Sequence, residues 1–181
     1  MTAFTRSQPR DGWSAYLDPG ERIIWHGRPD GGFYVRPMNW AVAAIGIVFA
    51  GFALFWMRVA AEAGGGFWAF GLLHFAVGIG IAVGAIWWGS FKRRRSWYAL
   101  SNARAFIASE LPLIGRRLKS WPITADTPIT LDDGALSNVW FASETRRGSK
   151  GRSYTVKIGF ERIRDGREVY RLMRKVQRGQ A

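Results

Sequence analysis

The sequence predicts an α+β membrane protein, in which a two-helix transmembrane hairpin is joined to a small antiparallel β-rich domain that ends in a helix. Three observations predict this class. Residues 41–90 contain only two charged side chains, Arg58 and Glu62. Residues 91–181 are strongly basic, with 20 Lys and Arg against 8 Asp and Glu. Short segments of this second part alternate between apolar and polar residues and are separated by turn residues, as in half-buried strands.

The composition excludes several kinds of functional site. The chain has 181 residues, a formal net charge of +13, no Cys and two His. Without Cys there is no disulfide, thiolate metal site or Cys nucleophile, and the wide separation of His26 and His74 disfavours a His-rich metal site. The mean hydropathy of −0.07 resembles that of a soluble protein. That value averages an apolar middle with a highly charged remainder, so the chain is not one uniform globule.

Two apolar runs are long enough to cross a bilayer. Trp40–Met57 has 18 residues without a charge, and Phe67–Gly89 has 23. A helix needs about 20 residues to cross a hydrocarbon core of roughly 30 Å, and both runs carry Trp near their ends, where indole rings favour the headgroup level. The rest of the chain is too small and too charged to bury two such helices. The first run follows a long polar segment without a clear cleavage site, so we expect an anchor rather than a signal peptide.

Basic residues predict the orientation of this hairpin. Lys92, Arg93, Arg94 and Arg95 follow the second run directly, whereas the link between the runs, residues 58–66, has one Arg and one Glu. Lys and Arg are retained on the cytoplasmic side, so we expect a multi-pass protein of the cell inner (plasma) membrane with both termini cytoplasmic. The expected organisation is a cytoplasmic segment at 1–37, a hairpin at 38–90 and a cytoplasmic domain at 91–181.

Small residues form a stripe on each predicted span: Ala43, Gly46, Ala50 and Ala53 on the first, and Ala76, Gly80 and Gly84 on the second. Small residues let helices approach closely in lipid. Two interpretations are open: the stripes pack within one hairpin, or two copies associate through the Gly80/Gly84 pair.

His74 lies inside the second span, and ionisable residues within a membrane are often functional. Neither span contains an acidic partner for this imidazole. We therefore favour a neutral imidazole bonded to a backbone carbonyl over a proton or ion relay.

The basic part of the chain reads as a series of short strands. Ser96–Ser101 and Arg104–Ala108 flank Asn102-Ala103, a hairpin pattern. Further strands are predicted at 118–123, 129–131, 139–142 and 154–160, and in the N-terminal segment a strand at about 21–26 is expected to pair with an edge of this sheet.

The chain ends in a predicted amphipathic helix. Asp165 is expected to cap it, with Glu168 three residues later as in a capping box. An apolar stripe then follows the helical period and predicts packing against the sheet: Val169, Leu172, Met173 and Val176.

Three segments carry a resemblance to a known family: Leu17-Asp-Pro-Gly-Glu-Arg-Ile-Ile-Trp25, Gly27-Arg-Pro29, and Tyr98-Ala-Leu-Ser-Asn-Ala-Arg-Ala-Phe-Ile107. In this order around a two-helix hairpin, they resemble bacterial membrane proteins with a pleckstrin-homology-like (PH-like) domain. Ser101 stands where those proteins typically have Thr, which keeps the hydroxyl. The resemblance implies a small, partly open PH-like antiparallel β-barrel of about seven strands, capped by the C-terminal helix. It implies no enzyme activity and brings no catalytic residues.

The leading functional hypothesis is a membrane-anchored PH-like binding or scaffold module whose basic face contacts anionic lipid headgroups or a protein partner. Each Lys or Arg near an anionic leaflet contributes about 1 kcal/mol. The candidate contacts are Lys92, Arg93, Arg94, Arg95, Arg116, Arg117, Lys119, Arg146, Arg147, Lys150 and Arg152. The alternatives are a membrane-tethered nucleic-acid-binding protein, suggested by charge and by Trp97, Trp121 and Trp140, and a subunit of a small oligomeric transporter or channel. We expect no nucleic acid among the partners.

No catalytic, cofactor-binding or metal-binding residues are predicted. Asp132-Asp133-Gly134 is more simply a turn than an acid pair, and neither Ser149 nor Ser153 has a His nearby in sequence. The sequence contains no Walker A loop, GxSxG or HExxH pattern. We therefore expect a binding protein and not an enzyme.

Overall fold

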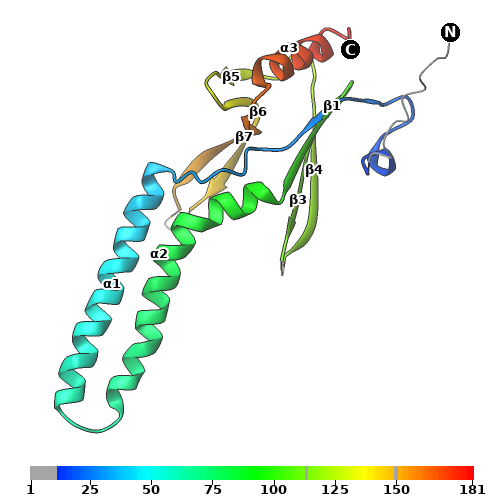
Figure 1. Cartoon of the computed structure of the whole chain (residues 1–181). Coiled ribbons are helices and arrows are strands. Elements are labelled where there is room, and N and C mark those ends of the chain that lie inside the picture. The colour runs from blue at the N-terminus through cyan, green and yellow to red at the C-terminus, as the bar shows by residue number, and fades with distance from the viewer. Residues whose placement is uncertain (1–11, 113, 149–150) are drawn as a thin grey trace, which may run out of the picture. The chain divides into compact units, whose positions relative to one another are not determined.

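The computed structural model describes residues 12–112, 114–148 and 151–181. The chain divides into two compact units. The first, here called the head, comprises the chain up to Asp30 and from Ser96 onward; the second, the helical hairpin, comprises Gly31–Arg95. Figure 1 shows two long helices in the hairpin, and strands with a C-terminal helix in the head.

The hairpin consists of α1 (Pro37–Glu62), a short 3-10 helix η2 (Phe67–Ala69) and α2 (Phe70–Arg94). Both helices are long and apolar enough to cross a membrane. They extend beyond the apolar runs at their polar ends, because charged side chains such as Arg58 and Glu62 are good helix formers.

Close backbone contact holds the two helices together. Gly46 of α1 lies against α2 so tightly that a Cβ built there would be 2.7 Å from both the Ala82 nitrogen and the Gly78 oxygen. A Cβ on Gly78 would likewise be 2.7 Å from the Ala50 nitrogen. The predicted stripe on the first helix therefore packs within the hairpin, and all four of its residues are buried.

The corresponding stripe on the second helix does not pack in this way. The α2 residues buried along the contact with α1 are Gly71, Gly78 and Ala82. Gly80 and Gly84 are exposed, with nothing within 4 Å of a Cβ built on either. The interpretation that Ala76, Gly80 and Gly84 form the hairpin contact is therefore wrong, because helix rotation is set by the closer approach at Gly78.

The head contains two antiparallel sheets with the orders β1-β2-β3-β4 and β5-β6-β7. Their strands are β1 (Ile23–Gly27), β2 (Ser96–Ser101), β3 (Arg104–Leu111), β4 (Gly115–Pro122), β5 (Thr130–Asp132), β6 (Ser137–Arg147) and β7 (Ser153–Ile163). β1 pairs with β2, which confirms that the N-terminal strand joins an edge of the C-terminal sheet. The hairpin predicted around Asn102-Ala103 is also confirmed.

The seven strands do not close into a barrel. No ladder joins β4 to β6 among the described residues, although these strands are linked by a Lys119–Glu144 ion pair of 3.1 Å and by the contact between the Trp121 and Phe141 rings. The segment between β4 and β5 contains Pro128 and follows Pro122, and Pro lacks the N–H that a continuous ladder requires. The expected small barrel is therefore corrected to two sheets packed around a shared core.

The core of the head is an aromatic cluster between the sheets, covered by α3 (Gly166–Gln177). The Phe160 ring is fully buried and lies 4.9 Å from the Tyr98 ring and 5.1 Å from the Phe141 ring, measured between centroids. The predicted apolar stripe of α3 packs here, with Val169 and Met173 fully buried. Asp165 is the N-cap residue of α3, as predicted, but its side chain makes no capping bond, because the carboxylate accepts a hydrogen bond from the Trp25 indole.

The glycine contact yields a test with a matched control. Gly46→Ala and Gly78→Ala place a Cβ against the backbone of the other helix and should destabilise the hairpin by about 1–3 kcal/mol. Gly80→Ala and Gly84→Ala add a Cβ in open space and should leave stability unchanged or raise it, because Ala favours helix over Gly. Thermal unfolding of the full chain in detergent measures the difference. Equal stability of the Gly46 and Gly80 variants would contradict the observed packing.

Candidate functional site

The two sequence motifs that carry the family resemblance meet in one hydrogen-bonded network. Glu21 from the N-terminal motif has a side chain that is only 4% exposed. Its carboxylate accepts bonds from the Ser101 hydroxyl and from the Arg104 guanidinium, both in the second motif. The hydrogen bonds from Arg104 and Ser101 lower the pKa of Glu21 to about 2. The carboxylate is therefore charged and tightly held at neutral pH.

Asn102 completes the link between the motifs. Its side-chain oxygen accepts a bond from the backbone N–H of Arg22 at 3.0 Å, and its own backbone N–H donates to the Arg22 carbonyl at 3.1 Å. The Ser101 hydroxyl also accepts the backbone N–H of Arg104 at 2.8 Å, which closes the β2–β3 turn. The motif residues therefore have a structural role, because their hydrogen bonds hold the N-terminal segment and β1 against β2 and β3.

The candidate basic residues of the head lie near the ends of two β-hairpins. Arg116, Arg117 and Lys119 are on β4, Arg146 and Arg147 end β6, and Arg152 directly precedes β7; we call these six residues the basic hairpin ends. All six are exposed. Lys150, the remaining candidate of this group, lies outside the described residues. The Lys119–Glu144 pair brings β4 next to β6, so residues from both hairpins form one charged surface there.

Acidic side chains neutralise only part of this surface. Glu144 is within 3.1 Å of Lys119 and 3.2 Å of Arg146, and these two cations lower the pKa of its carboxyl. Glu110 similarly pairs with Arg116 at 3.2 Å. Within the described part of the chain, three of the basic hairpin ends make no ion pair: Arg117, Arg147 and Arg152. The surface therefore keeps a net positive charge.

The basic run at the end of α2, by contrast, mostly contacts residues of the hairpin unit itself. Arg93 is 9% exposed, and its guanidinium donates to the carbonyls of Gly32 and Tyr34 and to the Ser90 hydroxyl. Arg94 donates to the Gly31 carbonyl at 2.9 Å, and the Arg95 guanidinium lies 4.8 Å from the Phe91 ring centroid.

Arg93 thus fastens the segment before α1 to the end of α2, a task that requires its burial. Its burial is at odds with the prediction that it contacts headgroups, so we leave it out of the proposed contact surface. Lys92, Arg94 and Arg95 are exposed.

The remaining polar candidates of the head have structural partners. The Asp133 carboxylate binds Arg167 and accepts the Ser137 hydroxyl, and the Arg167 bond lowers the pKa of Asp133. Asp132 accepts the Trp140 indole N–H at 2.6 Å. Among the described residues no group of three or more His, Asp or Glu is placed to hold a metal ion.

The aromatic side chains that suggested nucleic-acid binding also contact other residues of the head. The Trp97 ring lies under the Arg28 guanidinium at 4.7 Å, and Trp121 packs against Phe141. Trp140 bonds to Asp132, as above. A row of free rings on which bases could stack is not formed by these three residues.

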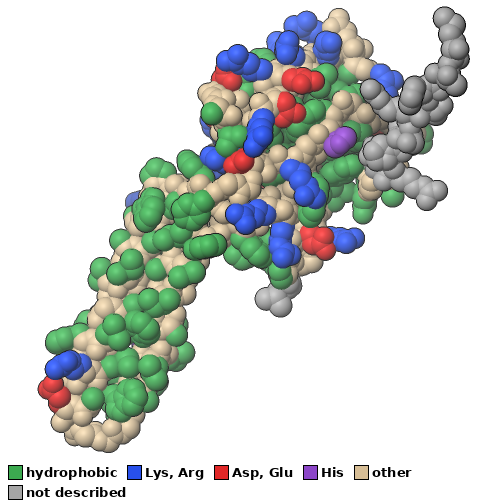
Figure 2. Space-filling view, in the orientation of Figure 1, with side chains coloured by type: hydrophobic (Ala, Val, Ile, Leu, Met, Phe, Trp, Pro, Cys, Tyr) green, Lys and Arg blue, Asp and Glu red, His purple; other side chains and the backbone are tan. Residues whose placement is uncertain are grey.

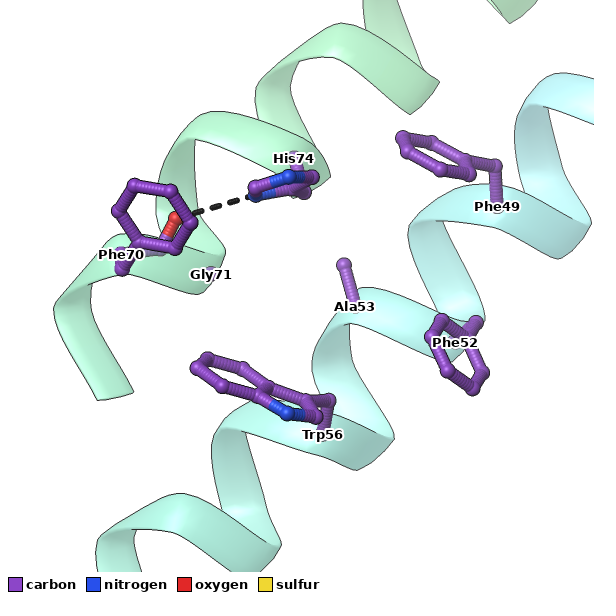
Figure 3. A pocket seen from close by; sticks show the side chains of 7 residues that line it. All are labelled: Phe49, Phe52, Ala53, Trp56, Phe70, Gly71 and His74. Carbon is purple, nitrogen blue, oxygen red and sulfur yellow. Dashed lines mark hydrogen bonds between the residues drawn. The ribbon is translucent and has the colours of Figure 1, made fainter. Parts of the chain in front are cut away.

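One apolar cavity lies in the helical hairpin (Figure 3). It has a volume of about 210 Å³ and is lined by Phe49, Phe52, Ala53, Trp56, Phe70, Gly71 and His74. His74 contributes the only imidazole, and its Nδ1 lies 3.3 Å from the Phe70 carbonyl oxygen. This contact confirms the expected bond from His74 to a backbone carbonyl.

A comparison of the chain with protein-family models, with curated proteins and with solved structures finds no match in any of the three.

The Glu21 network predicts a specific dependence of stability on pH. A carboxyl whose pKa is lowered from 4.5 to about 2 by folding stabilises the folded state above pH 4.5, and this contribution is lost as the pH falls toward 2. Its size at neutral pH is on the order of 3 kcal/mol, for a pKa lowered from 4.5 to about 2. Glu21→Gln should remove most of it, whereas Asp126→Asn, at an exposed loop position, should not.

Calorimetric unfolding of the head transition in the full chain, at pH 7 and pH 3, measures both effects. The wild type should lose stability between these pH values by clearly more than Glu21→Gln does. A pH response that is the same in wild type and variant would show that Glu21 does not stabilise the fold through its charge.

Proposed function

We propose that the protein is a membrane-anchored PH-like binding module, in which α1 and α2 span the bilayer and the basic hairpin ends of the head contact anionic lipid headgroups. The observation that carries the proposal is a single chain with two distinct surfaces. Figure 2 shows mostly hydrophobic side chains over the two long helices, and Lys and Arg gathered over the head. The two steps of the proposal, membrane insertion and headgroup contact, have separate support.

Insertion is supported by the exposure of the hairpin. Eleven large apolar side chains on α1 and nine on α2 are exposed, among them Val48 at 72% and Trp87 at 62%. A core helix of a soluble protein would bury most of such side chains. In the hairpin, only 22% of an apolar 18-residue stretch of the first helix is buried, and only 17% of the corresponding stretch of the second. Each large apolar side chain gains roughly 1.5–3 kcal/mol on leaving water. A bilayer supplies that environment on all sides of the hairpin.

The backbone and the flanking residues agree with insertion. Within α1 and α2 the main-chain groups are satisfied by helical hydrogen bonds, as the hydrocarbon core requires. Lys92, Arg93 and Arg94 occupy the last turn of α2, while the link at the other end carries only the Arg58–Glu62 pair, 3.8 Å apart. By the positive-inside rule this asymmetry favours a cytoplasmic location for both chain ends and hence for the head.

Headgroup contact is supported by charge. Residues 144–157 contain five Lys and Arg against one acidic residue, and residues 110–119 contain three against one. Arg117, Arg147 and Arg152 are exposed, and each basic residue near an anionic leaflet contributes about 1 kcal/mol. Three such residues would together supply about 3 kcal/mol, a binding constant raised roughly a hundredfold. An acidic protein partner would use the same surface, and association through Gly80 and Gly84 stays a prediction.

The absence of native Cys permits a direct test in the full chain. A spin label on Ser153→Cys, at the exposed start of β7, reports the distance of the hairpin ends from lipid headgroups that carry a chelated nickel ion. In nanodiscs, relaxation of the label by nickel should be stronger with anionic lipid than with zwitterionic lipid, and 0.5 M salt should remove the difference.

A triple variant that reverses the charge of the unpaired basic residues should abolish the effect of anionic lipid. Its substitutions are Arg117→Glu, Arg147→Glu and Arg152→Glu. The matched control reverses three charges on α3 and at its C-cap: Arg171→Glu, Arg174→Glu and Arg178→Glu. It should behave as the wild type. Equal relaxation in both lipids for the wild type would rule out the headgroup function and leave a protein partner as the occupant of this surface.

A further inference from the structure

The cavity of the helical hairpin combines an apolar wall with one polar side chain. Figure 3 shows the His74 ring extending from α2 toward α1, between the Phe70 and Phe49 rings. The ring centroids of these two residues are 5.1 and 6.2 Å from that of His74. Phe52 and Phe70 remain 64% and 58% exposed, so the cavity opens at the surface of the hairpin. A ligand can thus enter sideways, which in a bilayer means from the lipid.

His74 is the residue of the cavity lining whose side chain can offer a hydrogen-bond acceptor. The Phe70 carbonyl can only accept, so Nδ1 carries the proton of their 3.3 Å contact. No carboxylate lines the cavity. In this tautomer the other nitrogen, Nε2, carries a lone pair. Within the described part of the chain, no group donates a hydrogen bond to it.

An acceptor without a donor is costly among apolar side chains. A ligand that is apolar except for one hydroxyl group would satisfy this acceptor by donating a hydrogen bond to it. One aromatic ring fits this space: an apolar cavity of about 150 Å³ holds benzene, and the cavity of the hairpin measures about 210 Å³. Aromatic walls add favourable edge and face contacts to such a ring.

We propose that this cavity binds a lipid-soluble phenol, whose ring lies among Phe49, Trp56 and Phe70 and whose hydroxyl donates to Nε2 of His74. The inference rests on the proposed membrane insertion of the hairpin but not on headgroup binding by the head. The binding requires no covalent step. Specificity comes from the single hydrogen bond, since the apolar walls would accept any ring of this size.

The test compares a 4-alkylphenol that carries a photoreactive diazirine with its methyl ether, which has the same body without the donor. The full-length protein in nanodiscs is labelled with each probe, and mass spectrometry quantifies labelling of peptides from residues 49–56 and 70–74. In the wild type the phenol should label these peptides about fivefold more than the ether, the factor expected for one net hydrogen bond.

His74→Phe keeps an aromatic side chain at this position and removes the acceptor, so both probes should label this variant equally. The matched control is Leu73→Phe, at a neighbouring position that is 61% exposed and does not line the cavity; it should keep the preference for the phenol. Equal labelling of the wild type by the two probes, a preference that survives in His74→Phe, or its loss in Leu73→Phe overturns the proposal. The wild-type comparison needs no variant to fold.

A separate measurement distinguishes this failure from a failure of the proposed function. Alkaline carbonate should leave the wild type in the membrane pellet. If it releases the protein, insertion itself is wrong. If the protein is retained while the probes label equally, only the phenol site is wrong.

Discussion

The structure depends on one constraint, which is that the large apolar side chains of α1 and α2 are exposed along both helices. The two helices use only a narrow strip of small residues to contact each other, centred on Gly46 and Gly78. A strip of small residues lets the backbones approach, but it leaves the large side chains pointing outward. In water this arrangement would be unfavourable at every turn of both helices. In lipid it is the expected one, because tight packing and not burial of large groups drives association there.

The sequence predicted the helices well because their signal is long and simple. Runs of about 20 uncharged residues are compatible with few structures other than long apolar helices. The residues around Asn102 likewise predict the hairpin of β2 and β3. The rotation of α2 was not predictable, since Gly78 and Gly80 are equally small and only tertiary contact decides which one faces α1. The open arrangement of the two sheets was also missed, because strand lengths do not reveal which edges pair.

The sequence also predicted some features of the candidate site and not others. The sequence identified the charges of the basic hairpin ends, but it could not separate Arg93 from its neighbours, because burial of a guanidinium depends on the carbonyls that surround it. The motif residues Glu21, Ser101 and Arg104 were singled out for resemblance and prove to stabilise the head through one network. Residues that recur in a motif therefore need not be those that bind a ligand. Asp165 occupies the predicted N-cap position of α3, but its carboxylate binds the Trp25 indole, a contact 140 residues away in sequence that no local pattern indicates.

Cysteine accessibility in intact cells tests the central claim, that the hairpin spans the membrane with the head inside, most directly. The chain has no native Cys, and Gly66, in the link between the helices, and Ser143, on β6, are both exposed. A maleimide that does not cross membranes should label Gly66→Cys in intact cells, and Ser143→Cys only after the cells are permeabilised. Labelling of Ser143→Cys in intact cells, or protection of Gly66→Cys until permeabilisation, would contradict the account.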